Sequence, residues 1–179
     1  AQQTSLTSGC TECTTGMLCP GGAFKSDCPP GQFGDPDAAG QCKPCPHGFY
    51  CEGGKKKEKC PTGRYHNATN QSSINSCINC IKGYYCKGGN DITPCPIAKY
   101  GSMKGGKTEE DGCANCELGK YGTGSGKDIE TEACRSCSPG FYGNGVDQSS
   151  NSSYCNICPK GHICQGKLDK THCELVSRL

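Results

Sequence analysis

The apolar residues of this 179-residue chain do not recur with the 3.6-residue period of an amphipathic helix. They occur as single aromatic or aliphatic residues among glycine, cysteine and polar residues. Short runs such as residues 63–67 and 119–123 have the composition of strands in two-stranded ribbons. We therefore predict mostly turns and short two-stranded β-ribbons, with little or no helix.

The apolar positions belong to a pattern, Cys-x-x-Gly-x-aromatic, that occurs nine times. Position 4 is glycine except at Ala98, and position 6 is aromatic except at Leu18 and Ile163. Glycine permits a turn with positive φ, and the aromatic ring can lie over a disulfide and give each repeat a miniature core. No repeat could fold alone, so we expect the repeats to stack and contact only their neighbours, as an elongated, solenoid-like rod. Each repeat is named here by its first cysteine: Cys13, Cys28, Cys45, Cys60, Cys80, Cys95, Cys116, Cys137 and Cys158.

The repeats have two lengths, which differ at position 7. Short repeats carry a cysteine there: Cys19, Cys51, Cys86 and Cys164. Long repeats carry Gly34, His66, Gly101, Gly122 or Gly143 instead, and close at Cys42, Cys77, Cys113, Cys134 or Cys155.

Composition indicates how such a chain is stabilised. It has 20 Cys and 27 Gly but no Trp and only four Phe, so little apolar surface is available for burial. Cysteine at this density is typical of a disulfide scaffold made in an oxidising compartment. Three N-glycosylation sequons, at Asn67, Asn70 and Asn151, also favour a secreted or cell-surface glycoprotein carrying N-linked glycans.

Residues 60–80 and 137–158 carry a resemblance to a known family. The first segment begins Cys-Pro-x-Gly-x-Tyr and the second begins Cys-x-Pro-Gly-x-Tyr, and both end in Cys-x-x-Cys. This pattern is similar to the ephrin-receptor-like cysteine-rich repeat. The resemblance covers residues 10–173 and leaves an N-terminal arm at 1–9 and, at 174–179, a C-terminal tail or a truncated next repeat. It implies an array on an extracellular protein of animals or protists. The long repeat is also similar to a module of tumour-necrosis-factor-receptor ectodomains whose two cysteines bond to each other.

The pairing of the cysteines has two open solutions. If short repeats are insertions that bring their own bond, each repeat pairs its first cysteine with its last. This ladder reads Cys13–Cys19, Cys28–Cys42, Cys45–Cys51, Cys60–Cys77, Cys80–Cys86, Cys95–Cys113, Cys116–Cys134, Cys137–Cys155 and Cys158–Cys164. An interlocked scheme would instead bond cysteines of adjacent repeats, for example Cys45 with Cys60. Sequence alone does not choose between them.

The ladder leaves Cys10 and Cys173 without partners in the same chain. Two explanations remain open: their partners lie outside this sequence, or Cys10 of one molecule bonds Cys173 of the next, head to tail.

Zinc is the main alternative use of the cysteines. Cys113, Cys116, Cys134 and Cys137 have the spacing of a zinc ribbon, and so does the set that begins at Cys134. The two sites would share one Cys-x-x-Cys pair, so the spacing follows from the repeat period and we predict no metal site. A redox dithiol is disfavoured because no βαβ pattern surrounds any of the pairs.

No catalytic or cofactor site is predicted. Residues 122–127 resemble a phosphate loop but lack its first glycine and its final Ser or Thr, and are expected to form a flexible loop. Residues 109–111 lack the alternating ligands of a calcium loop and read as a solvated turn. The four histidines stand at non-equivalent positions. We therefore do not expect an enzyme.

Charge and hydropathy exclude further classes of partner. The net charge is +2, with acidic and basic residues interspersed, which argues against nucleic-acid binding. No apolar run is long enough to span a membrane. The lysine-rich run at residues 55–59 is expected to be a solvated loop tip.

These features favour a structural, non-catalytic component of an extracellular fibre, coat or matrix, with protein partners that include copies of itself. Flagellar hairs are one candidate, and the protist association comes from the resemblance. A surface antigen, adhesin or receptor-like ectodomain that binds a protein or glycan is the alternative.

Overall fold

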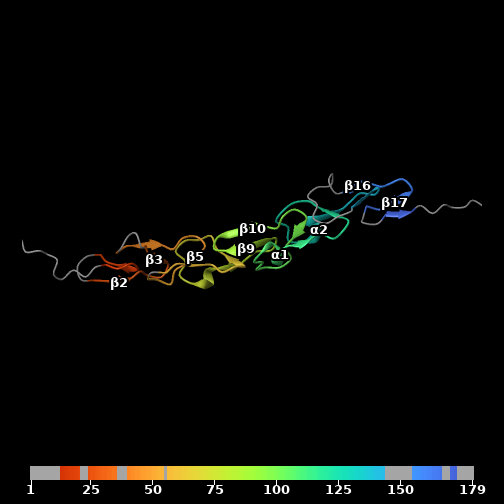
Figure 1. Ribbon diagram of the computed structural model, residues 1–179. Helices are drawn as coiled ribbons and strands as arrows, with labels where there is room; N and C mark the ends of the chain where they lie inside the picture. Colours follow the sequence, from red (N-terminus) through yellow and green to blue (C-terminus); the bar gives the residue numbers. More distant parts are fainter. Residues whose placement is uncertain are drawn as a thin grey trace, which may run out of the picture. The chain divides into compact units, whose positions relative to one another are not determined.

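The computed structural model describes residues 13–20, 24–35, 40–54, 56–143, 155–166 and 170–172. All regular structure in these residues is short, and it consists of two-stranded ribbons and three single-turn helices (Figure 1). The helices are η1 (Ile74–Ser76), α1 (Glu109–Gly112) and α2 (Glu130–Ala133). This is the disulfide-rich, ribbon-based fold class that the sequence predicts, and its helix content is small.

Nine ribbons lie in the described residues, each made of two strands that are consecutive in the sequence. They are β1 (Met17–Leu18) with β2 (Ser26–Asp27), β3 (Gln32–Gly34) with β4 (Cys42–Pro44), β5 (Phe49–Tyr50) with β6 (Glu58–Lys59), β7 (Arg64–Tyr65) with β8 (Ile78–Asn79), β9 (Tyr84–Gly88) with β10 (Asp91–Pro94), β11 (Lys99–Tyr100) with β12 (Ala114–Asn115), β13 (Lys120–Gly122) with β14 (Cys134–Ser136), β15 (Phe141–Gly143) with β16 (Cys155–Ile157), and β17 (His162–Cys164) with β18 (Lys170–His172).

Most ribbons join the two ends of one repeat. In β13 and β14, for example, Tyr121 at position 6 pairs with Arg135, and Gly122 at position 7 pairs with Cys134 in antiparallel register. The first strand follows the glycine turn and the second strand runs into the next repeat. The ribbon and the disulfide therefore close the same loop.

Contacts divide the chain into two compact regions. The first holds residues 1–78 with 88–91, and the second holds residues 79–87 with 92–179. Within each region the ribbons follow one another in chain order (Figure 1). This division was not predicted, because the cysteine pattern continues through the boundary.

Position 4 adopts the positive φ that the sequence predicts. Its φ lies between 68° and 95° in all nine repeats, and Ala98, the one residue there with a side chain, has the value of 68°. A residue with a β-carbon is strained in this region of backbone space, which explains the preference for glycine. Ala98 is fully buried.

The core consists mainly of disulfides covered by rings from the preceding repeat. Phe33 packs on Cys45 and Cys51, and Tyr50 packs on Cys60 and Cys77. The same relation holds in the second region for Tyr85 with Cys95 and Cys113, and for Tyr100 with Cys116 and Cys134. We expected each aromatic residue to complete a miniature core in its own repeat. That detail is wrong: each core is shared by two consecutive repeats.

Candidate functional site

The disulfides form a ladder with one bond in each repeat. The nine bonds are Cys13–Cys19, Cys28–Cys42, Cys45–Cys51, Cys60–Cys77, Cys80–Cys86, Cys95–Cys113, Cys116–Cys134, Cys137–Cys155 and Cys158–Cys164. Cys45 is thus bonded to Cys51 and not to Cys60, as the interlocked scheme would have it. Cys10 and Cys173 lie outside the described residues.

The cysteines with zinc-ribbon spacing belong to disulfides. Cys116 is bonded to Cys134, whereas Cys113 and Cys137 are bonded to Cys95 and Cys155. A cysteine binds zinc as a thiolate, so the four are not zinc ligands in this oxidised state. The spacing reflects the period of the repeat.

Successive repeats are joined by main-chain hydrogen bonds. The N–H of Asn70, in the Cys60 repeat, donates to the carbonyl of Cys45, and the N–H of Cys51 donates to the carbonyl of Gln71. In the second region the N–H of Gly105 donates to the carbonyl of Cys80, and that of Cys86 donates to the carbonyl of Gly106. In these repeats, the segment between the two strands of the ribbon completes the hydrogen bonding of the repeat before it. We call this segment the closing loop.

The closing loops share one backbone conformation. The residue that reaches back has a positive φ in each case described: Gly54, Asn70, Gly89, Gly105 and Gly126. Asn70 is the only one of these that is not glycine, and asparagine tolerates this conformation better than most residues. A second glycine is the sequence signal of this loop in most repeats; in the short repeats it ends the glycine turn that follows Cys51 or Cys86.

Contacts also extend to the second neighbour along the array. A β-carbon on Gly31 would lie 2.7 Å from the carbonyl oxygen of Asn70, and one on Gly48 would lie 2.3 Å from the backbone nitrogen of Asn90. Each contact joins repeats that are two apart. The expectation that repeats touch only their neighbours is therefore too narrow, and at Gly31 and Gly48 a side chain is disfavoured by the close approach as well as by φ.

Two of the three sequons lie in the closing loop of the Cys60 repeat. Asn67 and Asn70 are exposed there. The Asn67 carbonyl lies 2.6 Å from Nδ1 of His47, so the loop backbone is tied to the preceding repeat. Asn151 lies outside the described residues. The described sequons thus combine an exposed side chain with an ordered backbone.

Residues 56–59 of the lysine-rich run are exposed, as expected, but one of its lysines also contacts aromatic rings. The Nζ of Lys57 lies 4.8 Å from the centroid of the Phe33 ring and 5.7 Å from that of Phe49. Cation–π contacts at such distances contribute about 0.5–1 kcal/mol at exposed sites. Lys57 therefore covers the rings that pack around the Cys45–Cys51 disulfide, while Lys55 lies outside the described residues.

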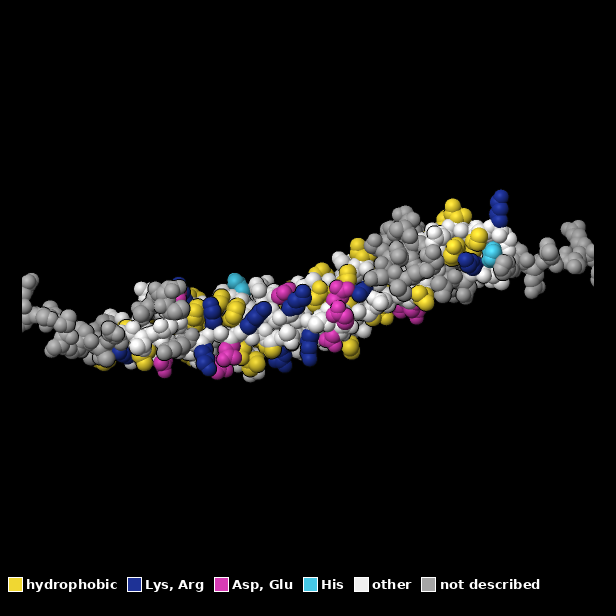
Figure 2. Space-filling view, in the orientation of Figure 1, with side chains coloured by type: hydrophobic (Ala, Val, Ile, Leu, Met, Phe, Trp, Pro, Cys, Tyr) yellow, Lys and Arg dark blue, Asp and Glu magenta, His cyan; other side chains and the backbone are white. Residues whose placement is uncertain are grey.

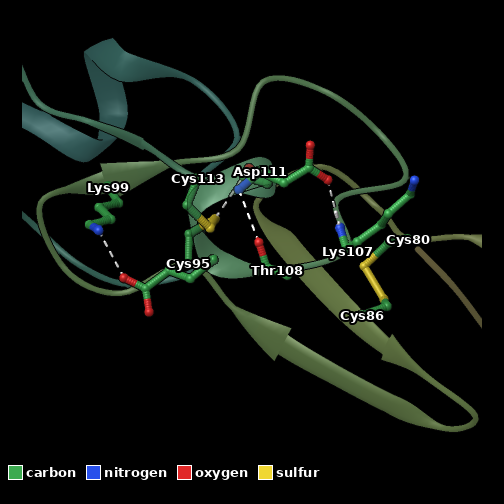
Figure 3. The surroundings of a disulfide bond; sticks show 10 residues. Cys80, Cys86, Cys95, Lys99, Lys107, Thr108, Asp111 and Cys113 are labelled. Atoms are coloured by element: carbon green, nitrogen blue, oxygen red, sulfur yellow. Dashed lines mark hydrogen bonds and ion pairs between the residues drawn. A yellow bond between two sulfur atoms is a disulfide. The ribbon is translucent and has the colours of Figure 1, made fainter. Parts of the chain in front are cut away.

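Residues 109–111 form helix α1 in place of the expected turn (Figure 3). The Thr108 hydroxyl accepts a hydrogen bond from the Asp111 N–H at the start of this helix. Lys99 Nζ lies 2.8 Å from Glu109 Oε1, on the same repeat as the Cys95–Cys113 disulfide (Figure 3). Hydrogen bonds from the backbone N–H of Glu110 and from the Thr108 hydroxyl lower the pKa of the Glu110 carboxyl. The acidic residues thus belong to a short helix that Thr108 caps, and Glu109 forms an ion pair with Lys99.

The next long repeat has the equivalent ion pair. Lys120 Nζ lies 2.6 Å from Glu130 Oε1, at the start of α2, and 2.9 Å from Glu117 Oε2. Hydrogen bonds to both carboxylates raise the pKa of Lys120. Helix α2 begins after Ile129, which provides no side-chain cap.

Residues 122–127, which resemble a phosphate loop, include the closing loop of the Cys116 repeat. The Gly126 N–H donates to the carbonyl of Cys95, and the Lys127 carbonyl accepts from the N–H of Gly101. We expected a flexible loop here, but its backbone is held by the preceding repeat.

The histidines differ in environment. His66 is buried beside the Cys60–Cys77 disulfide, and its ligand nitrogen and the two sulfur atoms all lie within 4.8 Å of one another. The four histidines stand at non-equivalent positions, and we did not predict that His66 lies in a cluster with Cys60 and Cys77. Alignment of the repeats could have found it, because His66 stands at position 7, where Cys51 of a short repeat bonds to Cys45.

The surface carries charges of both signs. Basic and acidic side chains are interspersed on the face of the molecule that Figure 2 shows. Among the described residues, no helix is long and apolar enough to cross a membrane.

No protein-family model and no curated protein matches the sequence.

Proposed function

We propose that this chain is a structural, non-catalytic glycoprotein of an extracellular fibre, coat or matrix. The observation that supports this most is the closing loop. Because five closing loops of the described residues complete the preceding repeat with the same two kinds of hydrogen bond, an array can be lengthened by whole repeats without new contacts. Scaffolds that must span distance need this property.

The chemistry of the bonds supports an extracellular setting. Nine disulfides fit an oxidising compartment. Each bond closes a loop of 6 to 18 residues and should stabilise the fold by about 2–3 kcal/mol, so resistance to denaturation does not depend on a large apolar core. The exposed Asn67 and Asn70 are proposed carriers of N-linked glycans. The resemblance to ephrin-receptor-like repeats favours a protein of a microbial eukaryote, with flagellar hairs as one candidate.

Electron microscopy of the native material tests this proposal. We expect filaments or a layered coat, together with concentration-dependent assembly of the purified oxidised chain in sedimentation experiments. A chain that remains a monodisperse monomer at high concentration, and isolated native particles without a filament or coat, would reject it.

A binding ectodomain is the second candidate, and exposed apolar side chains favour it. Phe24 and Ile157 are 81% and 78% exposed, so each offers an apolar side chain to a partner. In this case the oxidised monomer should bind a cell surface or an extract of surface glycans saturably, and changing Phe24 and Ile157 to Ser should abolish that binding while the disulfides remain intact.

A further inference from the structure

The cluster of Cys60, Cys77 and His66 contains a buried nitrogen without a partner. His66 is 5% exposed, and its Nδ1 has no hydrogen bond in the described part of the chain. Its other ring nitrogen, Nε2, lies 3.0 Å from the carbonyl oxygen of Phe49. A carbonyl only accepts, so the proton of the neutral ring is on Nε2 and Nδ1 carries a lone pair. A buried acceptor left unpaired destabilises the fold, and it calls for an explanation.

The repeat explains why this nitrogen lies next to sulfur. In the Cys45 and Cys80 repeats, position 7 is the cysteine that bonds to position 1. In the Cys60 repeat the same position holds His66, while Cys60 bonds to Cys77 further along the chain. The backbone therefore carries the imidazole to the place where a short repeat brings its second sulfur. Cys60 and Cys77 are 2% and 3% exposed, so all three ligand atoms are buried together.

We propose that Cys60, Cys77 and His66 bind Zn²⁺ when the Cys60–Cys77 disulfide is reduced, so that this repeat exchanges a covalent bond for a metal ion. Zinc bound by thiolate at about 2.3 Å and imidazole at about 2.0 Å requires ligand atoms roughly 3.5–3.8 Å apart in a tetrahedral site. The ligand atoms already lie within 4.8 Å of one another, so small rotations of the three side chains after reduction would bring them to these separations.

The charge of the site favours a divalent ion, and its two thiolate ligands and one imidazole suit zinc. Two thiolates and a neutral imidazole around Zn²⁺ sum to zero charge, whereas a monovalent ion would leave a net negative charge in a buried place, which is costly. Two cysteines, one histidine and an open fourth position form a known class of zinc site. The inference does not depend on the proposed structural function.

The step is balanced with glutathione as the reductant. Two glutathione thiols reduce the disulfide to two cysteine thiols and become glutathione disulfide. Zn²⁺ then replaces the two thiol protons, which pass to solvent, and Nδ1 of His66 donates its lone pair. Zinc binds only the reduced form, so it pulls the redox equilibrium toward reduction.

The test measures that equilibrium in the full oxidised chain, in a glutathione buffer with and without buffered free Zn²⁺. Thiols are trapped by alkylation and located by peptide mapping. With zinc at about 100 times its dissociation constant, the equilibrium constant for reduction of Cys60–Cys77 should rise about 100-fold. The Cys95–Cys113 pair is the internal control, because it closes an equivalent long repeat that has Gly101 in place of His66.

Two variants separate a metal site from a packing effect. His66→Gly makes the Cys60 repeat match the control, and His66→Gln keeps a side chain that can donate to Phe49. For each variant, the equilibrium constant for reduction of Cys60–Cys77 with zinc is divided by the constant for the same variant without zinc. An effect of the substitution on stability is present in both constants and cancels in this ratio. Both should lose the zinc effect at least ten-fold, and the zinc X-ray absorption of the wild type should show two sulfur ligands and one nitrogen ligand. The proposal fails if zinc favours reduction of both pairs equally, if either variant responds as the wild type does, or if the metal is held by four sulfurs.

Discussion

The N–H of Asn70 donates a hydrogen bond to the carbonyl of Cys45, at a distance of 2.9 Å, and thereby joins the Cys60 repeat to the Cys45 repeat. The carbonyl oxygen of Asn70 faces Gly31, one repeat further back. One residue thus links three repeats through its backbone alone. Side-chain identity at this position is therefore less important than its positive φ.

The first prediction concerns the close approach at position 4. Gly48 and Gly140 have similar φ values of 76° and 87°, but a β-carbon on Gly48 would meet Asn90 at 2.3 Å, whereas one on Gly140 would meet no atom of the described residues within 4 Å. Gly140→Ala should cost only the backbone strain, about 1–2 kcal/mol. Gly48→Ala should cost about 1–3 kcal/mol more, because the backbone must move. Tyrosine fluorescence during guanidinium unfolding, with all disulfides intact, measures both.

Equal losses in these two variants would show that φ alone selects glycine at this position. The contact between repeats two apart would then not be important for stability.

The second prediction concerns connectivity. Non-reducing peptide mapping should recover Cys45 joined to Cys51 and Cys60 joined to Cys77, since each pair closes one repeat. The Cα atoms of Cys45 and Cys51 lie 5.8 Å apart, within the usual range for a disulfide. A peptide in which Cys45 is joined to Cys60 would contradict both the ladder and the fold.

Much of this fold could be predicted from the sequence because its determinants are local. A cysteine, a glycine three residues later and an aromatic residue two positions beyond specify a turn and a strand within six residues. The fold class and the turn at position 4 follow from that spacing. Ala98 shows that the turn forms at a cost even without glycine.

The relations between repeats could not be predicted in the same way. That Tyr50 covers the Cys60–Cys77 disulfide depends on the path of the chain into the next repeat, and position 6 looks the same whichever disulfide it covers. The cluster around His66 was missed for a related reason. Its sulfurs lie 6 positions before it and 11 positions after it in the sequence, and only the alignment of His66 with Cys51 indicates that it lies beside them.

The third prediction concerns helix capping, for which α1 and α2 form a matched pair. Thr108 caps α1 through its hydroxyl, while Ile129 precedes α2 without a side-chain cap. Thr108→Ala should lower the free energy of unfolding by about 1 kcal/mol, and Ile129→Thr should raise it by up to about the same amount. Thermal unfolding followed by circular dichroism checks both. A loss of stability in Ile129→Thr would mean that the half-exposed Ile129 side chain contributes more than a cap does.

The fourth prediction is a pH dependence at Glu110. Hydrogen bonds from its own N–H and from the Thr108 hydroxyl hold its pKa below the ordinary value of 4.5 in the folded chain. A carboxyl with a lowered pKa contributes stability that is fully present above that ordinary value and is lost as the pH falls toward the folded pKa. The wild type should therefore lose more stability than Glu110→Gln between about pH 6 and pH 3. Denaturant unfolding at both pH values measures the difference, and identical losses in the two proteins would contradict the prediction.

The closing loop has a consequence for biosynthesis. A ribosome delivers the array from its N-terminal end, and the carbonyl of Cys45 finds its donor only after Asn70 has been made. Maturation of the chain must therefore lag behind translation by about one repeat, and each newly made repeat exposes its thiols to oxidation before its backbone is held in place. The order in which cysteines appear then helps to select the correct pairs, since Cys51 is available to Cys45 before Cys60 is.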